Sequence, residues 1–307
     1  MRISTSSIYT QGGSQISYLQ NQVSTTQQEI SSGQAYLNPA GNPVNASQAL
    51  VVSQQQAANT QYGSNRQAAE TSLNMAGSAL SSMTTLLQSV NSLVVSAGNP
   101  GLNAADRSNI ATQIKNDYNS LLSLANSTDG NGNYLFGGYQ NASPPFVSAT
   151  DASGNPVVQY TGDQGQIMAQ VGPNQQVAVS VSGQAMLQSA GTDIFSTLNN
   201  LTSLLNNNTL TPAQITAGLS TASNGIQQTL NRVVQTSATV GSTLSQLSQL
   251  DSAGSSLDLQ YSQSLSTLQN LDYAKAITQL SEQTTTLQAA QQSFVKIANL
   301  SLFNYIN

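Results

Sequence analysis

The stretch LNMAGSALSSMTTLLQSVNSLV, residues 73–94, decides the fold of this chain. Its apolar residues recur in alternating steps of three and four, which is the spacing of helices that pack along a shared seam. The seam consists of Leu73, Ala76, Leu80, Met83, Leu87, Val90 and Val94. This pattern predicts a long helix whose stripe lies in the internal core of a coiled-coil-like rod.

The N-terminal end of the chain carries a stripe of the same kind. It consists of Ile16, Leu19, Val23 and Ile30. The steps between these residues predict a helix over roughly residues 14–32, with polar Thr26 on the same line. Gly33 is expected to cap the end of this helix, because glycine accepts a left-handed backbone without strain.

The C-terminal end carries the longest pattern, which runs at helical spacing from Ile215 to Phe294 and on to the tail. The tail stripe consists of Leu280, Leu287, Phe294, Ile297, Leu300 and Phe303. Two helices at the end of a rod bury only one face each, because no third layer lies behind them. The residues of the two terminal stripes are therefore the candidate assembly interface.

Polar residues predict where the helices begin. Asn45 is expected to cap the helix that carries the 73–94 seam. Asn103 is expected to cap the next helix, with Asp106 near its positive N-terminal end. Thr211 is expected to cap the long C-terminal pattern, because Pro212 fits a first helical turn.

Residues 129–183 interrupt the helical pattern with short runs rich in β-branched residues. The runs are VVQY, QIMAQV and QVAVSV, separated by Gly, Pro, Asn and Asp. They predict a small β insert between two helical halves. The expected fold class is therefore mainly α: an elongated helical coiled-coil-like rod, with the N- and C-termini together at one end and a small β domain at the other.

The expected domain organisation has five segments. Residues 1–40 and 255–307 are the two parts of a terminal helical domain. Residues 41–128 and 191–254 are the two parts of the helical rod domain, and residues 129–190 form the small β-rich outer domain. A chain that leaves and returns in this way brings its two ends together.

Composition excludes several classes of function. Only 6% of the residues are charged, the net charge is −5, and seven basic residues are spread thinly. Nucleic-acid binding requires clustered Lys and Arg, so no nucleic-acid partner is expected. No apolar run is long enough to insert into a membrane. The start, MRISTSSIYTQGG, lacks the apolar core of a secretory signal, so any export is expected to proceed without a cleaved signal peptide.

The absence of Cys and His limits the chemistry that the chain can perform. A Ser–His–Asp triad cannot form, and ordinary zinc or iron ligation is excluded. Two loops, at Asp129 and Asp151, carry oxygen ligands but depart from the calcium-loop pattern. The remaining acids are scattered. We therefore expect no enzyme, no catalytic, cofactor-binding or metal residues, and no cofactor.

Four stretches carry a resemblance to a known family. They are MRISTSSIYTQ at residues 1–11, LQNQVSTTQQEISSGQAYLNPAGNPVNASQAL at 19–50, GNYLFGGYQNASPPF at 132–146 and QYTGDQGQ at 159–166. Together they resemble the flagellin family. The ending LSLFNYIN is most similar to members at the junction of hook and filament. One departure is that Gln34 stands near a usually basic position, and Gly41 and Asn42 stand where the family carries acids.

The resemblance implies an extracellular structural component of the bacterial flagellum that adapts the hook to the filament and is required for motility. It implies a homo-oligomeric layer between the first hook-associated protein and flagellin. It further implies type III export, with a flagellar export chaperone on the C-terminal segment. Two alternatives stay open: a filament-forming flagellin, or a surface enzyme or adhesin whose activity lies in the 129–183 insert.

Overall fold

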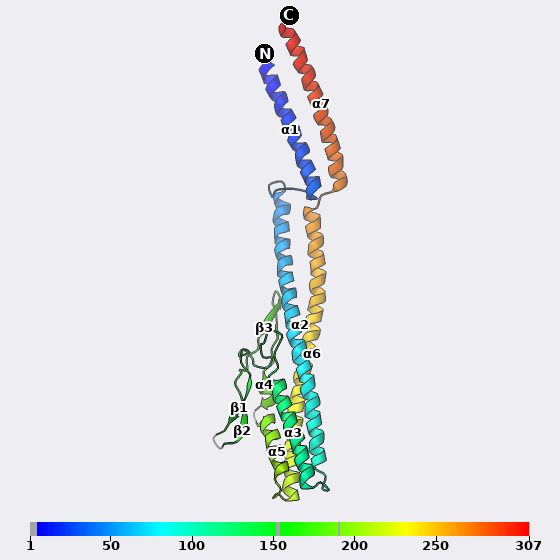
Figure 1. Ribbon diagram of the computed structural model, residues 1–307. Coiled ribbons are helices and arrows are strands. Elements are labelled where there is room, and N and C mark those ends of the chain that lie inside the picture. Colours follow the sequence, from blue (N-terminus) through cyan, green and yellow to red (C-terminus); the bar gives the residue numbers. More distant parts are fainter. Residues whose placement is uncertain (1–4, 152–153, 190, 307) are drawn as a thin grey trace. The chain divides into compact units, whose positions relative to one another are not determined.

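A computed structural model describes residues 5–151, 154–189 and 191–306 of the chain (Figure 1). The side chains at positions 5, 6, 8 and 298–306 lie outside this description. The fold is mostly helical, with small two-stranded sheets. It divides into two compact units. The central unit spans residues 59–255, and the terminal unit joins the residues before 59 to those after 255.

The central unit is built on long helices. α2 (Pro43–Ala97) and α6 (Pro212–Gln269) run through it, and α3 (Ala104–Ala125) and α5 (Ile194–Asn206) pack beside them (Figure 1). The seam at residues 73–94 is buried along its whole length, and none of its seven members is more than 4% exposed. The prediction that this seam is internal core is therefore confirmed.

Two predicted helix starts are confirmed by their hydrogen bonds. The Asp106 N–H donates to the Asn103 side chain at 2.9 Å, and the Asp106 carboxylate accepts from the Asn103 N–H at 3.3 Å. At α6, the Gln214 N–H donates to Thr211 Oγ1 at 3.3 Å, and Gln214 Oε1 accepts from the Thr211 N–H at 2.9 Å. Both pairs satisfy donors that a helix start leaves free.

The predicted cap of α2 is wrong by three residues. α2 begins at Pro43, and its cap is Asn42: the Asn45 N–H donates to Asn42 Oδ1 at 3.1 Å. The reason is that proline suits the first helical position, because its missing N–H would find no partner there. Asn45 therefore lies inside the first turn and does not precede it.

The described residues of the β insert form three antiparallel two-stranded sheets. Their strands are β1 (Phe146–Thr150) with β2 (Pro156–Tyr160), β3 (Met168–Gly172) with β4 (Gln175–Ala178), and β5 (Gln188–Ser189) with β6 (Thr192–Asp193). A short helix, α4 (Gly183–Leu187), precedes β5. The sequence pattern missed β1, which follows two prolines directly and has one buried end, at Phe146.

The insert lies along the flank of the long helices (Figure 1), and side chains of these helices hold it there by hydrogen bonds. On α2, Asn65 donates to the Gln170 carbonyl at 2.7 Å, and Arg66 donates to the Val171 carbonyl at 3.1 Å. On α6, Arg232 Nε donates to the Met186 carbonyl at 3.0 Å. The acceptors are all backbone carbonyls, so these hydrogen bonds do not depend on the side chains of the insert.

The terminal unit is built on α1 (Thr5–Ser32) and α7 (Tyr273–Ile306), which lie side by side (Figure 1). α1 begins earlier than the expected residue 14. It ends as predicted at Gly33, which has φ of 72° and donates its N–H to the Glu29 carbonyl at 2.8 Å. In the ranges that the structure describes, no helix is both long and apolar enough to cross a membrane.

The C-terminal pattern, expected to run unbroken, is interrupted between α6 and α7. The Lys275 N–H donates to Asp272 Oδ1 at 3.1 Å, so Asp272 caps a new helix. The residues before it pair with the linker that follows α1. Ala35 donates to the Gln269 carbonyl at 2.8 Å, and Leu271 donates to the Gly33 carbonyl at 2.9 Å. These bonds take the place of helical ones, which is why the helix stops despite its apolar periodicity.

Candidate assembly interface

The terminal stripes predicted from the sequence face each other between α1 and α7. Leu19 is 8% exposed, and the other apolar members on α1 are half-buried. On α7, Leu280, Leu287 and Phe294 are half-buried, whereas Ile297 is 50% exposed. The side chains of Leu300 and Phe303 lie outside the described residues. The role of all ten residues in association remains a prediction.

Two seam residues escaped the sequence analysis. The ring of Phe294 rests on Gly12, so closely that a Cβ built on Gly12 would lie 2.6 Å from Cδ2 of the ring. Tyr9 meets the same ring edge-on, with 6.0 Å between centroids. A signal existed for Gly12, because it lies four residues before Ile16 on the same helical line. A search for apolar side chains does not find Gly12, because it has none. Its role is to leave room for the ring of Phe294.

Two close approaches fix the register of the α1–α7 pair. Gly12 contacts Phe294, and Gly33 contacts the Tyr273 hydroxyl, so the two helices run antiparallel. In both contacts the residue numbers add up to 306. A constant register along the pair therefore places Leu19 opposite Leu287. The remaining layers are Ile16 with Ala290, Val23 with Gln283, Thr26 with Leu280, and Ile30 with Ala276.

This register explains the burial along both helices. All seven positions on each side of the inferred layers are buried or half-buried apart from Tyr273, which is 51% exposed at the end of the pair. Residues three and four apart alternate on each helix, as in a heptad seam. The predicted stripes are thus brought together by one antiparallel pair. Beside Gly12, the pair leaves an open crevice of about 350 Å³ next to Ile16 and Ile297.

A second apolar surface lies elsewhere in the terminal unit, between the start of α2 and the end of α6. It is a groove of about 620 Å³, lined by Val51, Val52 and Leu268 among Ser, Gln and Thr side chains. Val44 and Leu50, on the same turns of α2, are 62% and 60% exposed. Sequence reasoning missed this surface, because the first part of α2 has only a weak heptad pattern.

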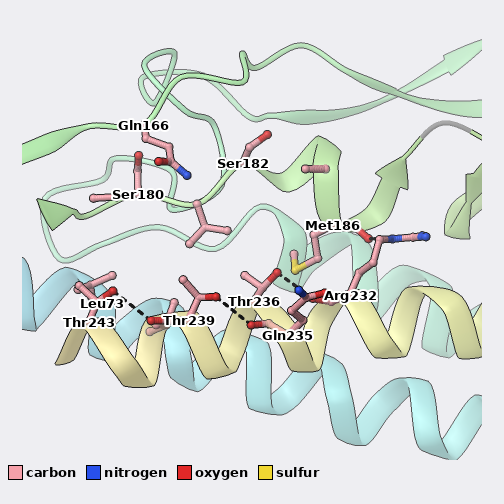
Figure 2. Close-up of a pocket in the computed structure, with 14 residues that line it drawn as sticks. Leu73, Gln166, Ser180, Ser182, Met186, Arg232, Gln235, Thr236, Thr239 and Thr243 are labelled. Carbon is pink, nitrogen blue, oxygen red and sulfur yellow. Dashed lines mark hydrogen bonds between the residues drawn. The ribbon is translucent and has the colours of Figure 1, made fainter. Parts of the chain in front are cut away.

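The central unit contains a crevice of about 400 Å³ between α6 and the insert (Figure 2). Its floor is a row of threonines whose hydroxyls are already bonded within the helix. Thr236, Thr239 and Thr243 donate to carbonyls four residues earlier at 2.8–3.1 Å. Arg232 is also at this crevice, and burial lowers the pKa of its guanidinium. None of the described residues that line it carries a carboxylate.

The two loops considered for calcium are hydrogen-bonded turns of the same form. The Asp129 carboxylate accepts from the backbone N–H groups of Asn131 and Asn133, both at 2.8 Å. A side-chain hydrogen bond from Asn133 is the main cause that lowers the pKa of Asp129. The Asp151 carboxylate accepts from Asn155 in the same way. These two carboxylates therefore stabilise the turns in which they lie.

The glycine-rich stretches GNYLFGGYQ and QYTGDQGQ lock together around Asp163. Its carboxylate accepts from the N–H groups of Tyr139 at 2.9 Å and Gly165 at 2.8 Å. Its own N–H donates to the Gly137 carbonyl at 3.1 Å. Gly138, with φ of 69°, lies directly against Asp163, where a side chain would not fit. These residues therefore shape the insert.

Comparisons with known proteins agree with this architecture. The bacterial flagellin N-terminal helical region matches residues 3–141. The chain is 33% identical to flagellar hook-associated protein 3 of Salmonella typhimurium and 32% identical to that of Escherichia coli K12, over 99% of each chain in both cases. The crystal structure of flagellar hook-associated protein 3 from Legionella pneumophila has the same fold, with a TM-score of 0.63 at 18% identity over 71% of this chain and 98% of that one. The chain therefore belongs to the flagellin family, within the group of flagellar hook-associated protein 3.

Proposed function

We infer that the chain is a structural subunit of the flagellar hook–filament junction and has no enzymatic role. Family membership places it in the flagellum. The observation that supports its mode of action is the α1–α7 pair, an apolar seam whose members are mostly half-buried. Burying a Leu or Phe side chain fully contributes roughly 1.5–3 kcal/mol, so this seam gains stability when further helices cover it.

We propose that the chain is divided into three domains, two of which are each made of two separate segments. Residues 1–40 and 255–307 act as the terminal domain, which packs with the same domain of neighbouring copies in one homo-oligomeric layer. Residues 41–128 and 191–254 form the rod, and residues 129–190 form the outer domain. The first hook-associated protein lies on one side of the layer and flagellin on the other.

Genetic complementation tests the proposed function. A strain that lacks the protein is expected to build hooks and to release flagellin monomers into the medium, and the full chain should restore filaments and motility. Filament growth without the protein would contradict the proposal. The alternative, a filament-forming flagellin, predicts that the purified chain polymerises alone into long filaments, which the junction proposal does not.

We further propose that the chain leaves the cell through the flagellar type III apparatus. A chaperone would hold the C-terminal stripe before export, because that stripe is apolar and lacks its neighbours inside the cell. Residues 1–30 fused to a reporter should be secreted only when the flagellar export gate is intact. Secretion of the fusion by a gate-deficient strain would contradict this route.

A further inference from the structure

The turn at residues 129–133, at the start of the insert, contains a pair of residues that is open to spontaneous chemical change. The chain has two Asn–Gly pairs, Asn131–Gly132 and Asn224–Gly225, and one Asp–Gly pair, Asp129–Gly130. In such a pair the backbone nitrogen of the glycine attacks the side-chain carbonyl carbon of the residue before it. Glycine allows this approach because it has no side chain and a permissive backbone. The structure places the three pairs in very different surroundings.

The pair Asn131–Gly132 lies in an open turn. Both residues are exposed, and the side chain of Asn131 forms no hydrogen bond with any residue that the structure describes. A Cβ built on Gly132, which has φ of 87°, would meet no atom within 4 Å. The Gly132 N–H donates to the Asp129 carbonyl at 3.1 Å, and the attack requires this bond to open. A single bond in an exposed turn opens at little cost in free energy.

The pair Asn224–Gly225 lies inside the long helix α6. There, hydrogen bonds between residues four apart fix the backbone on both sides of the pair. The Gly225 nitrogen reaches the side chain of Asn224 only if these helical bonds break. The reaction therefore requires local unfolding of the helix, which costs far more free energy than the opening of a turn.

The pair Asp129–Gly130 is protected by the ionisation of its side chain. The Asp129 carboxylate accepts from the N–H groups of Asn131 and Asn133, both at 2.8 Å. A further bond from the Asn133 side chain is the main cause that lowers the pKa of Asp129, so the carboxylate stays charged at neutral pH. A charged carboxylate is a poor target for a nucleophile. Of the three pairs, Asn131–Gly132 alone combines a neutral, unbonded side chain with a backbone that opens easily.

We propose that Asn131 is a site of spontaneous deamidation in the folded chain. The Gly132 nitrogen bonds to the Cγ of Asn131, and the side-chain NH₂ group takes up the proton of the Gly132 N–H and leaves as ammonia. The product is a succinimide ring. Water then attacks one of the two ring carbonyls and leaves either aspartate or isoaspartate at position 131. The sequence of steps consumes one water and releases one ammonia, and it needs no oxidant or reductant.

The modification should loosen the turn in which it occurs. Either product places a negative charge close to the Asp129 carboxylate, and like charges repel. Isoaspartate also adds a methylene group to the backbone between the N–H groups of residues 131 and 133, both of which donate to Asp129. The same turn closes the bridge between Thr128 and Tyr134. Amide hydrogen exchange over residues 128–134 is therefore expected to be faster in aged protein than in fresh protein.

Ageing of the folded full chain at neutral pH tests the proposal. Chymotryptic peptides that end at Tyr134 and Leu230 separate the two Asn–Gly pairs, and mass spectrometry with fragmentation locates the converted residue. We expect Asn131 to convert at least about tenfold faster than Asn224, because the helix must open first. In the chain denatured with guanidinium chloride, the two rates should agree within about threefold, because neither pair is then protected.

The variant Asn131→Gln is the matched control. It keeps a neutral amide, but its longer side chain would have to close a larger ring, which forms more slowly. Conversion at position 131 and the change in hydrogen exchange should both disappear in this variant.

Two results would overturn the assignment. If Asn131 converts in the denatured chain but stays intact in the folded chain, the Gly132 hydrogen bond protects it and the proposal is wrong. Isoaspartate at position 129 with Asn131 unchanged would show that the carboxylate is the reactive group instead.

Discussion

At the scale of single residues, the side chains of the terminal stripes differ in how deeply they are buried. Their regular spacing in the sequence does not distinguish them. Leu19 is buried in the pair, whereas Ile297 is half exposed. Phe294 has a particular environment, with the ring of Tyr9 at its edge and Gly12 beneath it. A stripe therefore contains both residues that close the pair and residues that remain available to neighbours.

The substitution Phe294→Asp should abolish assembly and leave the central unit intact. It removes apolar burial, which contributes roughly 1.5–3 kcal/mol once the half-buried ring is fully covered, and it places a carboxylate against Gly12 and Tyr9, where it loses hydration. Incorporation into flagella measures the first effect, and the main melting transition by circular dichroism measures the second. Gln288→Asp, at an exposed position of the same helix, is the matched control.

If Phe294→Asp lowers the main melting transition as well, the tail is ordinary core and the association role is wrong. A hydrogen-exchange measurement on the monomer adds a second criterion. Short helices in a two-helix contact have little stability of their own, because most helical stability comes from packing. Strong protection of residues 280–297 in the free chain would contradict the view that neighbours complete this pair.

At the scale of secondary-structure elements, Arg66 ties α2, α6 and the β3 strand together. It is 6% exposed, donates to the Val171 carbonyl at 3.1 Å, and pairs with Asp251 at 3.2 Å. The Asp251 side chain is 64% exposed, so solvent screens the ion pair and the bond to the carbonyl matters more. The guanidinium lies directly against Gly254 on α6.

Two glycines of α6 should therefore respond to alanine with opposite signs. Gly254→Ala places a methyl group on Arg66, so it should displace the guanidinium and destabilise the central unit by about 1–3 kcal/mol. Gly241 has open space around its Cα, so Gly241→Ala should stabilise the helix by up to about 1 kcal/mol. Chemical denaturation of the two variants measures both effects. Stabilisation by Gly254→Ala would show that Arg66 is not held in place.

At the scale of the whole molecule, the scarcity of charge predicts how the protein responds to solution conditions. The chain contains no His and only 6% charged residues. Its polar surfaces are instead made of Ser, Thr, Asn and Gln, which do not titrate. Association through such surfaces should depend little on salt, because screening acts only on charges.

Stability of the central unit should change little between about pH 5.5 and 8.5, because His and Cys are the side chains whose ordinary pKa falls in this range, and the chain contains neither. At lower pH two effects oppose each other. The pKa of Asp129 is lowered by its hydrogen bonds, so its contribution is present above the unfolded pKa of 3.8 and is lost as the pH falls through the lower folded value. The pKa of Asp117 is raised by burial, so protonation relieves a cost there.

Thermal melts across this range, at low and high salt, test the prediction. A shift of the melting temperature by more than about 5 °C between pH 5.5 and 8.5 would contradict it, since that corresponds to roughly 1 kcal/mol or more. A matched measurement of flagellar incorporation in media of different ionic strength tests the terminal interface in the same way.

What the sequence determined by itself was periodic or local. The 73–94 seam, the Asn103 and Thr211 caps and the glycine end of α1 followed from spacing and from backbone chemistry, which act within a few residues. Only the tertiary structure decided the rest. α6 stops at Gln269 because its next groups pair with the linker after α1, across more than two hundred residues. Gly12 acquires its role from Phe294, which lies opposite it on α7. The spacing within one stripe does not specify the register of the helix that packs against it.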